Sequence, residues 1–248
     1  MDALILCGGF ATRLEPITFF VPKPLLPVGG KPILDHIVDS VKKAGAKRIV
    51  LSTNKKFYDQ FRYWSESAEL HGIKGGVEIV MEPTMNHGEK YGAIKGINYA
   101  IEKLGLDGDL MVIAGDNFYT FGLDRITEKF TQTRKTTIAV HDVKSLDDAR
   151  RFGVVDMKND RVVGFEEKPK SPKSSLISTG IYVFPKEMLG MLKEYVSGGN
   201  NPDAPGYFLQ WLMKKDAVYG VVYTDNWYDI GTVETYKEVF DRYVSRQA

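Results

Sequence analysis

The residues best suited to chemistry stand near the start of the chain, where a short apolar segment runs into paired glycines and basic residues. The segment 3–7 reads ALILC and is followed by Gly8 and Gly9, then by Arg13 and by Lys23, which stands between two prolines. Backbone N–H groups exposed by glycines, together with fixed cations, are what a polyphosphate needs. The sequence therefore predicts a phosphate-handling loop directly after a first strand.

Two better-known phosphate loops do not fit this stretch. The dinucleotide fingerprint G-x-G-x-x-G opens a helix directly after its strand, but here the two glycines are adjacent and four prolines between positions 16 and 27 prevent an immediate helix. The P-loop requires G-K-[ST], whereas Gly30 and Lys31 are followed by Pro32. Both readings are excluded.

The stretch closely resembles the signature of the sugar-1-phosphate nucleotidyltransferases (nucleotide-sugar pyrophosphorylases). That signature is written G-G-x-G-T-R-L-x-P-x-T, then P-K-P-L-[LM]-P-[VI] and G-K-P; this chain reads GGFATRLEPIT from position 8, PKPLLPV from 22 and GKP from 30. Ala11 replaces the usual glycine. At a positive φ its methyl group would cost about 1 kcal/mol, and otherwise almost nothing, so we expect the loop to tolerate it.

The resemblance assigns the first half of the chain to the nucleotide. It implies that Arg13 and Lys23 are catalytic and act on the phosphates of the nucleoside triphosphate. Glu82, after a later strand, and Gly92, in a weakly matching stretch, join this set. The nucleotide-binding residues expected are Gly8, Gly9, Ala11, Thr12, Arg13, Glu82 and Gly92.

Two aspartates are implied as ligands of Mg²⁺. Asp116 follows the apolar run 110–114 in a pattern resembling the family's L-x-G-D, and Asp229 lies in WYDIGT, which resembles W-x-D-x-G-T. Two carboxylates with water suit an ion that sheds its hydration reluctantly. Asp107 and Asp109 imitate a D-x-D motif, but they precede the strand, so we interpret them as part of a turn.

Three further stretches resemble the sugar-binding part of the family: FGVV at 152–155, EEKP at 166–169 and TGIY at 179–182. The resemblance implies that Glu167 accepts bonds from sugar hydroxyls and that Lys168 binds the sugar phosphate. Gly153 and Gly180 complete the sugar-phosphate-binding set.

The elements that must position these residues are predicted from apolar periodicity. The order of strands and helices in the first half predicts an α/β fold with a mostly parallel mixed sheet covered by helices on both faces. The family resemblance implies that this is the Rossmann-like nucleotide-diphospho-sugar transferase fold. Ligands bind outside the carboxyl ends of strands in such sheets.

We expect one domain over 1–248, with a nucleotide-binding half near 1–136, a sugar-binding half near 137–248 and no C-terminal β-helix domain. Predicted strands are 3–7, 49–51, 77–81, 110–114, 137–143, 153–157, 162–166, 177–184 and 218–223, and predicted helices are 33–44, 58–66, 92–104, 186–196, 208–215 and 232–242.

Composition and charge exclude several classes of protein. Lys and Arg number 33 against 32 Asp and Glu, so no basic field points to nucleic acid or a membrane surface. The single cysteine, Cys7, allows no intrachain disulfide and is expected in the core. Neither a signal peptide nor a membrane-spanning window is visible, so we expect a cytoplasmic protein. The resemblance also implies a homo-oligomer.

The function expected is a Mg²⁺-dependent coupling of a nucleoside triphosphate to a hexose 1-phosphate by direct in-line displacement, with dTTP or UTP and glucose 1-phosphate as first choice, as in the short glucose-1-phosphate thymidylyltransferases. The alternatives are a non-catalytic nucleotide-sugar sensor or regulatory subunit on the same fold, and a choline phosphate cytidylyltransferase. Base identity is open, because residues 82–93 match the family poorly. Tyr91 there either stacks on the base or packs on the following helix.

Overall fold

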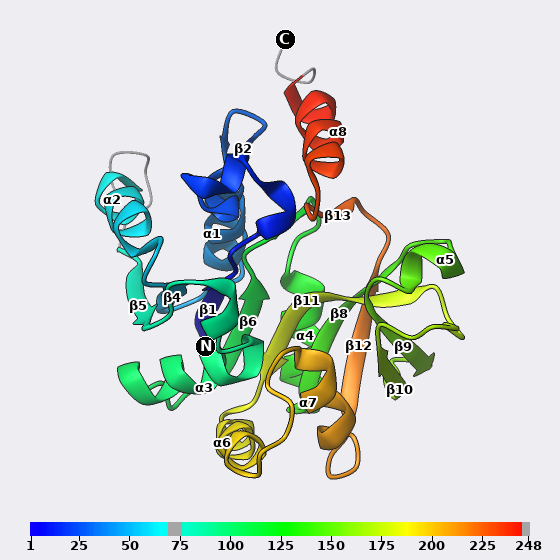
Figure 1. Ribbon diagram of the computed structural model, residues 1–248. Coiled ribbons are helices and arrows are strands. Elements are labelled where there is room, and N and C mark those ends of the chain that lie inside the picture. Colours follow the sequence, from blue (N-terminus) through cyan, green and yellow to red (C-terminus); the bar gives the residue numbers. More distant parts are fainter. Residues whose placement is uncertain (69–75, 245–248) are drawn as a thin grey trace.

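The computed structural model describes residues 1–68 and 76–244, which build one central sheet flanked by helices (Figure 1). The nine strands of the sheet lie in the order β5-β4-β1-β6-β11-β8-β12-β10-β9. Their bounds are β1 Asp2–Cys7, β4 Ile49–Asn54, β5 Glu78–Glu82, β6 Leu110–Ala114, β8 Thr136–Asp142, β9 Gly153–Lys158, β10 Arg161–Glu167, β11 Leu176–Phe184 and β12 Val218–Tyr223.

The sheet is mixed: the strands of the first half pair with one another only in parallel, and those of the second half pair in both ways. β5, β4, β1 and β6 pair in parallel, as expected for strands joined by helical crossovers. β11 then pairs antiparallel with both β6 and β8, and β10 pairs antiparallel with β9 and β12, while β8 and β12 are parallel. The α/β fold class expected from the sequence is confirmed.

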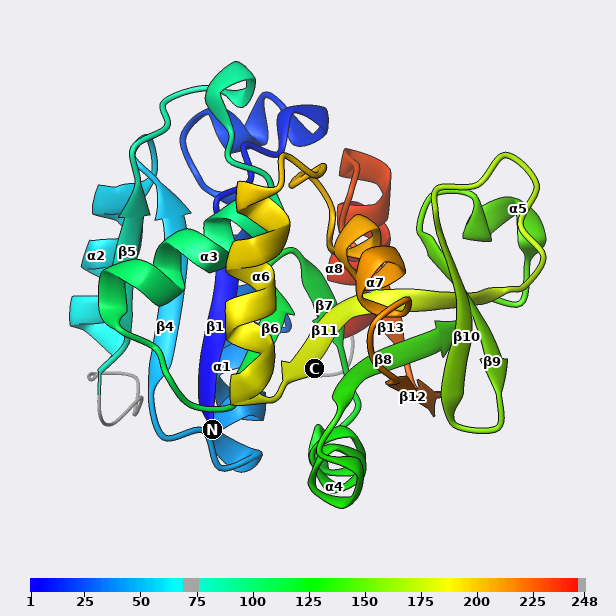
Figure 2. The same ribbon diagram turned by 90° about the horizontal axis from the view of Figure 1, so that it is seen from below.

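Helices cover both faces because successive strand residues point to opposite sides. On β1, Ile5 and Cys7 pack with one hydrophobic cluster, which includes residues of α1 (Ile33–Lys43), α2 (Tyr58–Ala68) and α4 (Asp124–Thr133). Leu4 packs with the other, which includes α3 (Ala93–Leu104), α6 (Leu189–Ser197) and α7 (Pro205–Leu212). Figure 2 shows α3 and α6 side by side over the strands of the first half.

Shorter elements complete the chain, and several carry loop residues of interest. They are the 3₁₀ helices η1 (Thr12–Leu14), η2 (Ile17–Phe19), η3 (Lys23–Leu25), η4 (His87–Glu89) and η5 (Lys186–Met188), the helices α5 (Leu146–Ala149) and α8 (Val233–Val244), and the two-stranded sheets β2–β3 (Pro27–Val28, Lys31–Pro32) and β7–β13 (Asn117–Tyr119, Trp227–Asp229). α8 projects from the body near the β2–β3 hairpin (Figure 1).

Most predicted elements lie within three residues of their observed bounds. The sequence reading missed α4, which has an apolar stripe of only two buried residues, Ile126 and Phe130. It also missed β7 and β13, which are only three residues long and gain their hydrogen bonds from each other. The predicted helix 208–215 begins earlier, because Pro205 is well suited to the first helical turn.

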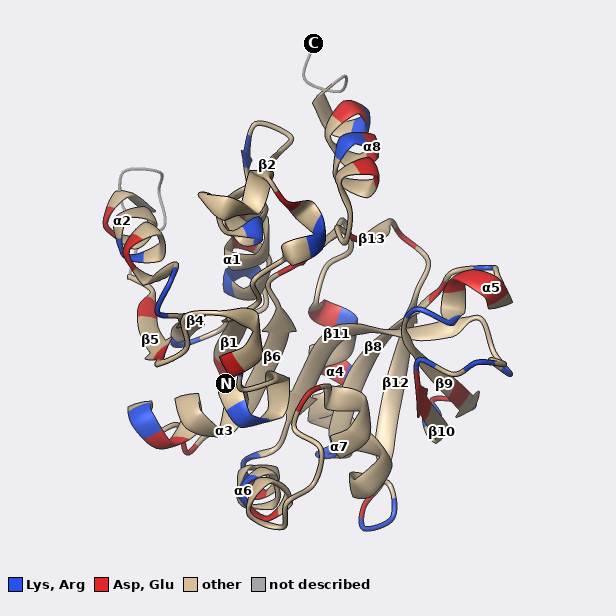
Figure 3. Ribbon diagram, in the orientation of Figure 1, with Lys and Arg blue, Asp and Glu red and all other residues tan. Residues whose placement is uncertain are grey.

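Charged residues of both signs are interspersed over the helices, in keeping with the near-zero net charge (Figure 3). Among the described residues, none of the helices is both long and apolar enough to span a membrane.

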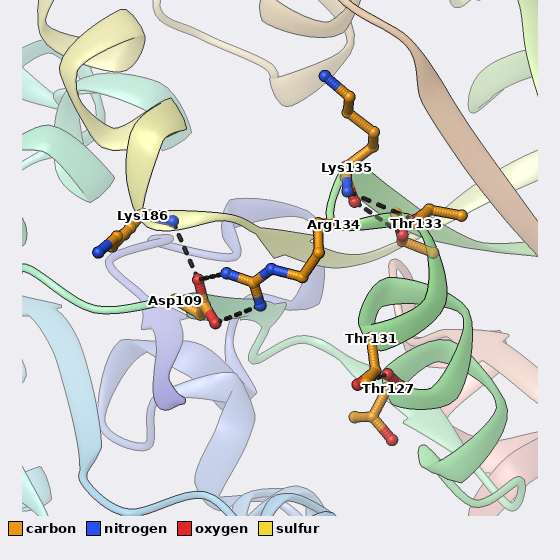
Figure 4. Close-up of polar contacts among 8 residues, drawn as sticks. Asp109, Thr127, Thr131, Thr133, Arg134, Lys135 and Lys186 are labelled. Atoms are coloured by element: carbon orange, nitrogen blue, oxygen red, sulfur yellow. Dashed lines mark hydrogen bonds and ion pairs between the residues drawn. The ribbon is translucent and has the colours of Figure 1, made fainter.

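Asp109 has a structural role in the loop between α3 and β6. Its carboxylate accepts two hydrogen bonds from the Arg134 guanidinium, at 2.8 and 2.9 Å, and one from the Lys186 N–H at 3.1 Å (Figure 4). The paired guanidinium lowers the pKa of Asp109. The contacts tie the start of β6 to the end of α4 and to η5.

Candidate active site

A cavity of about 450 Å³ opens at the carboxyl ends of β1 and β6. Its lining brings together ten of the predicted site residues from both halves of the chain: Gly8, Gly9, Ala11, Thr12, Arg13, Lys23, Glu82, Gly92, Asp116 and Gly180. This is the edge at which parallel α/β sheets bind ligands.

The loop after β1 keeps a compact form through local bonds. Ala11 adopts φ 47° and ψ 42°, so the methyl group that replaces the usual glycine lies in the left-handed region, at a cost of about 1 kcal/mol. The Thr18 hydroxyl donates to the Ala11 carbonyl at 2.9 Å, and Asn54 donates to the Gly8 carbonyl at 3.2 Å. These bonds hold the loop while Thr12 and Arg13 stay exposed to the cavity.

Lys23 is the buried cation of the site. Its side chain is 6% exposed, and its ammonium nitrogen lies 3.2 Å from Asp116 Oδ2 and 3.6 Å from Asp229 Oδ1. The two aspartates come together because β13 pairs with β7 in a register that places Asp229 opposite Asn117, the neighbour of Asp116. Burial raises the pKa of Asp229, with Lys23 acting against the rise and Asp116 adding to it.

The two aspartates fit a magnesium ion held jointly with substrate. Mg²⁺ is commonly bound by one or two carboxylates together with phosphate oxygens and water, and both carboxylates lie within 4 Å of one ammonium group, so they face a common space. Within residues 1–68 and 76–244, no three His, Cys, Asp or Glu side chains form a metal-binding group. A metal here therefore depends on these two residues and on oxygens of the substrate.

Glu82 lies in the wall of the cavity as a buried carboxylate. Ser52 donates to its Oε1 at 2.7 Å. A Cβ at Gly8 or Gly96 would approach the same carboxylate to 3.0 or 2.8 Å, so the glycines make room for it. Burial raises the pKa of Glu82, only partly offset by the bond from Ser52.

Gly92 and Tyr91 lie where the loop after β5 enters α3. Gly92 has φ +77°, and a Cβ there would approach the Pro202 carbonyl oxygen to 2.6 Å. Tyr91 lines the cavity, and its ring also packs edge-on against Tyr99, with the Lys95 ammonium 4.2 Å from its centre. Of the two roles left open by the sequence, packing on the following helix is therefore observed.

Three of the four predicted sugar-phosphate residues, Gly153, Glu167 and Lys168, are not part of the lining of the cavity. A Cβ at Gly153 would approach the Phe165 ring to 2.4 Å and Glu167 Oε2 to 3.2 Å, so this glycine accommodates side-chain packing. Burial raises the pKa of Glu167, with the Lys168 charge acting against it. The Lys168 N–H donates to the Phe152 carbonyl at 3.0 Å.

Gly180, the fourth, lines the cavity. It has φ +79°, and a Cβ there would approach Ala114 Cβ to 2.9 Å, so glycine lets β11 pass close to the strand that ends before Asp116. Asn117 donates to the Thr179 carbonyl at 2.7 Å and holds the two segments together.

Cys7 is buried at the carboxyl end of β1, as expected. A Cβ at Gly115 would approach its sulfur to 2.6 Å, and burial raises the pKa of the thiol well above its usual range. A buried neutral thiol is a poor nucleophile.

The sequence reading missed several residues that the fold brings to the cavity. Lys90 and Asp203 form an ion pair of 2.6 Å, and both line it. In the segment 197–206, the available signal was Asp203, which stands two positions before the Pro205 that begins α7. Other missed lining residues are His87, Tyr182, Pro205 and Gly231.

The chain belongs to the nucleotidyl transferase family, whose model matches residues 2–246. It is a member of the sugar-1-phosphate nucleotidyltransferases, since a 31% identical relative that it covers over nearly the full length carries a name of that class.

Two relatives of similar identity differ in how much of their own length this chain spans. The D-glycero-alpha-D-manno-heptose 1-phosphate guanylyltransferase of Campylobacter jejuni is 31% identical over 95% of this chain and 97% of the relative. The bifunctional protein GlmU of Methanococcus aeolicus is 31% identical over 93% of this chain, which spans 51% of that relative. Several relatives are thus considerably longer than this chain.

Solved structures share the fold. A Bacillus anthracis protein assigned as a glucose-1-phosphate thymidylyltransferase superposes with a TM-score of 0.85 at 26% identity, covering 98% of this chain and 95% of that one. A UDP-glucose pyrophosphorylase in complex with UDP-glucose superposes with a TM-score of 0.83 at 22% identity, which supports the fold alone.

Proposed function

We propose that this chain joins a nucleoside triphosphate and a hexose 1-phosphate to give a nucleoside diphosphate sugar and pyrophosphate. The observation that carries the proposal is the buried Lys23 ammonium beside Asp116 and Asp229, at a cavity formed by the glycine-rich loop. Both substrates are anions, so the task of the enzyme is to neutralise and orient them rather than to supply a nucleophile.

The residues of the first half act on the triphosphate. The backbone N–H groups of the loop at Gly8 and Gly9 donate hydrogen bonds to phosphate oxygens. The planar guanidinium of Arg13 is suited to bind two phosphate oxygens at once. Lys23 lies close enough to both aspartates to stabilise charge developing beside them. When bound at Asp116 and Asp229, Mg²⁺ would supply Lewis-acid stabilisation of the phosphate charge.

The residues of the second half orient the sugar phosphate. Glu167 accepts hydrogen bonds from ring hydroxyls, and Lys168 neutralises the phosphate whose oxygen attacks the α-phosphorus. Glu167 lies against α7, since a Cβ at Gly206 would approach its Oε2 to 2.2 Å. This contact fixes the carboxylate beside the cavity, next to Pro205 in its lining.

Glucose 1-phosphate with dTTP or UTP is the first substrate pair to test, supported by the motif pattern and the name of the Bacillus anthracis structure. The test is a pyrophosphate-release screen of all NTPs and dTTP against sugar 1-phosphates, with and without Mg²⁺. Absence of release for every pair, with NDP-sugar binding retained, would instead support the sensor alternative.

GTP is a second candidate, favoured by the buried carboxylate of Glu82. An ionised carboxylate only accepts hydrogen bonds, and guanine presents two adjacent N–H donors, whereas uracil and thymine present one N–H between two acceptor oxygens. The name of the Campylobacter jejuni relative, a guanylyltransferase, also supports GTP as the nucleotide.

Glu82→Gln separates the two candidates. If the enzyme uses GTP, the variant loses at least about tenfold in kcat/KM for GTP and gains relative activity with UTP, because the Gln amide matches a donor and an acceptor. A wild-type preference for dTTP or UTP would reject the guanine reading and leave the coupling reaction intact.

A further inference from the structure

The loop before α7 reaches from the second half of the chain to the first turn of α3. The Ala93 N–H donates to the Asp203 carbonyl and the Ile94 N–H to the Pro202 carbonyl, both at 3.0 Å. First-turn N–H groups lack partners within their helix, so this loop satisfies two of them. The missing Cβ at Gly92 allows the close approach, since any side chain there would meet the Pro202 carbonyl.

A side-chain ion pair closes the same junction. The Lys90 ammonium lies 2.6 Å from Asp203 Oδ1, with both side chains about half exposed. Lys90 directly precedes Tyr91, which packs on α3 and lines the cavity, so the pair fixes the segment that carries Tyr91. Both members line the cavity, on the side where the loop after β5 meets the loop before α7.

The same loop also borders the proposed sugar carboxylate. Asp203 stands three residues before Gly206, whose Cα faces Glu167 closely enough that a Cβ would overlap its Oε2. α7 is joined to β10 by Gln210, which donates to the Phe165 carbonyl at 2.9 Å. The charge of Asp203 adds to the effect of burial in raising the pKa of Glu167, against the opposing charge of Lys168.

We infer that Lys90 and Asp203 are positioning residues that couple the two substrate subsites. The Lys90–Asp203 pair holds the nucleotide-side segment 86–92 against the loop that supports Glu167, so ordering of either segment by its substrate favours the arrangement that binds the other. Such coupling is reciprocal: the nucleotide raises affinity for the sugar phosphate by the same factor as the reverse. The inference rests on the proposed function, which places the sugar at Glu167.

The coupling is measured by titration calorimetry. Glucose 1-phosphate, or the preferred sugar phosphate of the screen, is titrated with Mg²⁺ in the absence and presence of the α,β-methylene analogue of the preferred NTP. We expect the analogue to raise sugar-phosphate affinity in the wild type. In Asp203→Asn and Lys90→Met we expect that enhancement to fall about fivefold, because the interaction free energy of an ion pair of this exposure corresponds to about that factor. The analogue alone is expected to bind all three proteins within a factor of about three.

The matched control is Lys215→Met, which removes a similarly exposed ion pair with Glu194, at 2.7 Å, from outside the cavity lining. The control is expected to keep the wild-type enhancement. Unchanged enhancement in both Asp203→Asn and Lys90→Met, or an equal loss in the control, would overturn the inference. The proposed function is judged separately, by whether the wild type releases pyrophosphate at all.

A pH profile distinguishes this role from simple loosening of the loop. The charged groups that act on Glu167 are Asp203 and Lys168. Lys90→Met leaves Asp203 unpaired, which raises the pKa of Glu167 further and moves the acidic limb of kcat/KM for the sugar phosphate to higher pH. Asp203→Asn moves it to lower pH. Shifts in the same direction, or no shift in either variant, would contradict the coupling role.

Discussion

The ammonium group of Lys23 donates a 3.2 Å hydrogen bond to the carboxylate of Asp116, although 93 positions separate the two residues in the sequence. Asp229, at the end of β13, lies 3.6 Å from the same nitrogen. One buried cation thus lies close to two carboxylates and offsets part of the repulsion between them. This arrangement carries both the proposed chemistry and the clearest predictions.

Lys23→Met is expected to lower kcat at least about 100-fold, because it removes a fixed charge from the reacting phosphates. It also leaves Asp116 and Asp229 facing each other without a cation, so the melting temperature without metal falls. Added Mg²⁺ should then raise the melting temperature more in the variant than in the wild type. Single-turnover kinetics and thermal denaturation test the two parts. Near-normal turnover would remove Lys23 from the mechanism.

Asp116→Asn and Asp229→Asn are each expected to lower kcat by about 100-fold or more and to raise the Mg²⁺ concentration for half-maximal rate, because each removes a proposed ligand. Rates across a Mg²⁺ titration measure both effects. The control is Asp109→Asn, whose carboxylate binds Arg134 away from the cavity. It should cost about 1 kcal/mol of stability and leave kcat near the wild-type value. Wild-type Mg²⁺ dependence in both site variants would reject the metal site.

Glu82→Gln is expected to stabilise the unliganded protein at pH 8. The folded-state pKa of Glu82 is raised by burial. A carboxyl group whose pKa is raised above the unfolded value of about 4.3 costs stability above the folded pKa, and that cost disappears below the unfolded one. The melting temperature of the variant should therefore exceed that of the wild type at pH 8 and approach it near pH 4.

Glu78→Gln, on the same strand, supplies a control of opposite sign. The Arg48 guanidinium, which donates two bonds of 2.8 Å, lowers the pKa of Glu78. Its contribution to stability is therefore present at neutral pH and is lost as the pH falls through the lowered pKa. This variant should be slightly less stable than the wild type at pH 8. Equal changes in the melting temperature of both variants would contradict the assignment of Glu82 as a carboxylate whose charged form is destabilised by burial.

Lys168→Ala and Glu167→Ala are each expected to weaken use of the sugar 1-phosphate by about 2 kcal/mol, as for loss of a charged hydrogen bond, while NTP affinity stays close to that of the wild type. Calorimetric titration with NTP and Mg²⁺, beside kcat/KM for the sugar phosphate, separates the two ligands. Equal losses for both ligands would mean that this loop serves the nucleotide.

The sequence by itself determined the loop after β1 and the alternation of the side chains of β1 between the two faces of the sheet. The residues of the loop after β1 stand in one continuous stretch, so their spacing alone predicts their neighbours in space. Residues 3–7 likewise alternate between the two faces that the helices cover, as Ile5 and Leu4 show, because side-chain direction in a strand is a local property.

Only the tertiary structure decided which distant residues meet. Asp116 and Asp229 become neighbours through a three-residue strand pair, β7–β13, and Asp203 reaches Lys90 through a loop with no regular pattern. Such contacts are fixed by pairing register and by glycines at positions 92 and 180, where a Cβ would collide with a segment far away in the sequence. Periodicity describes one segment at a time, so the distances between segments depend on how the whole sheet and its helices pack.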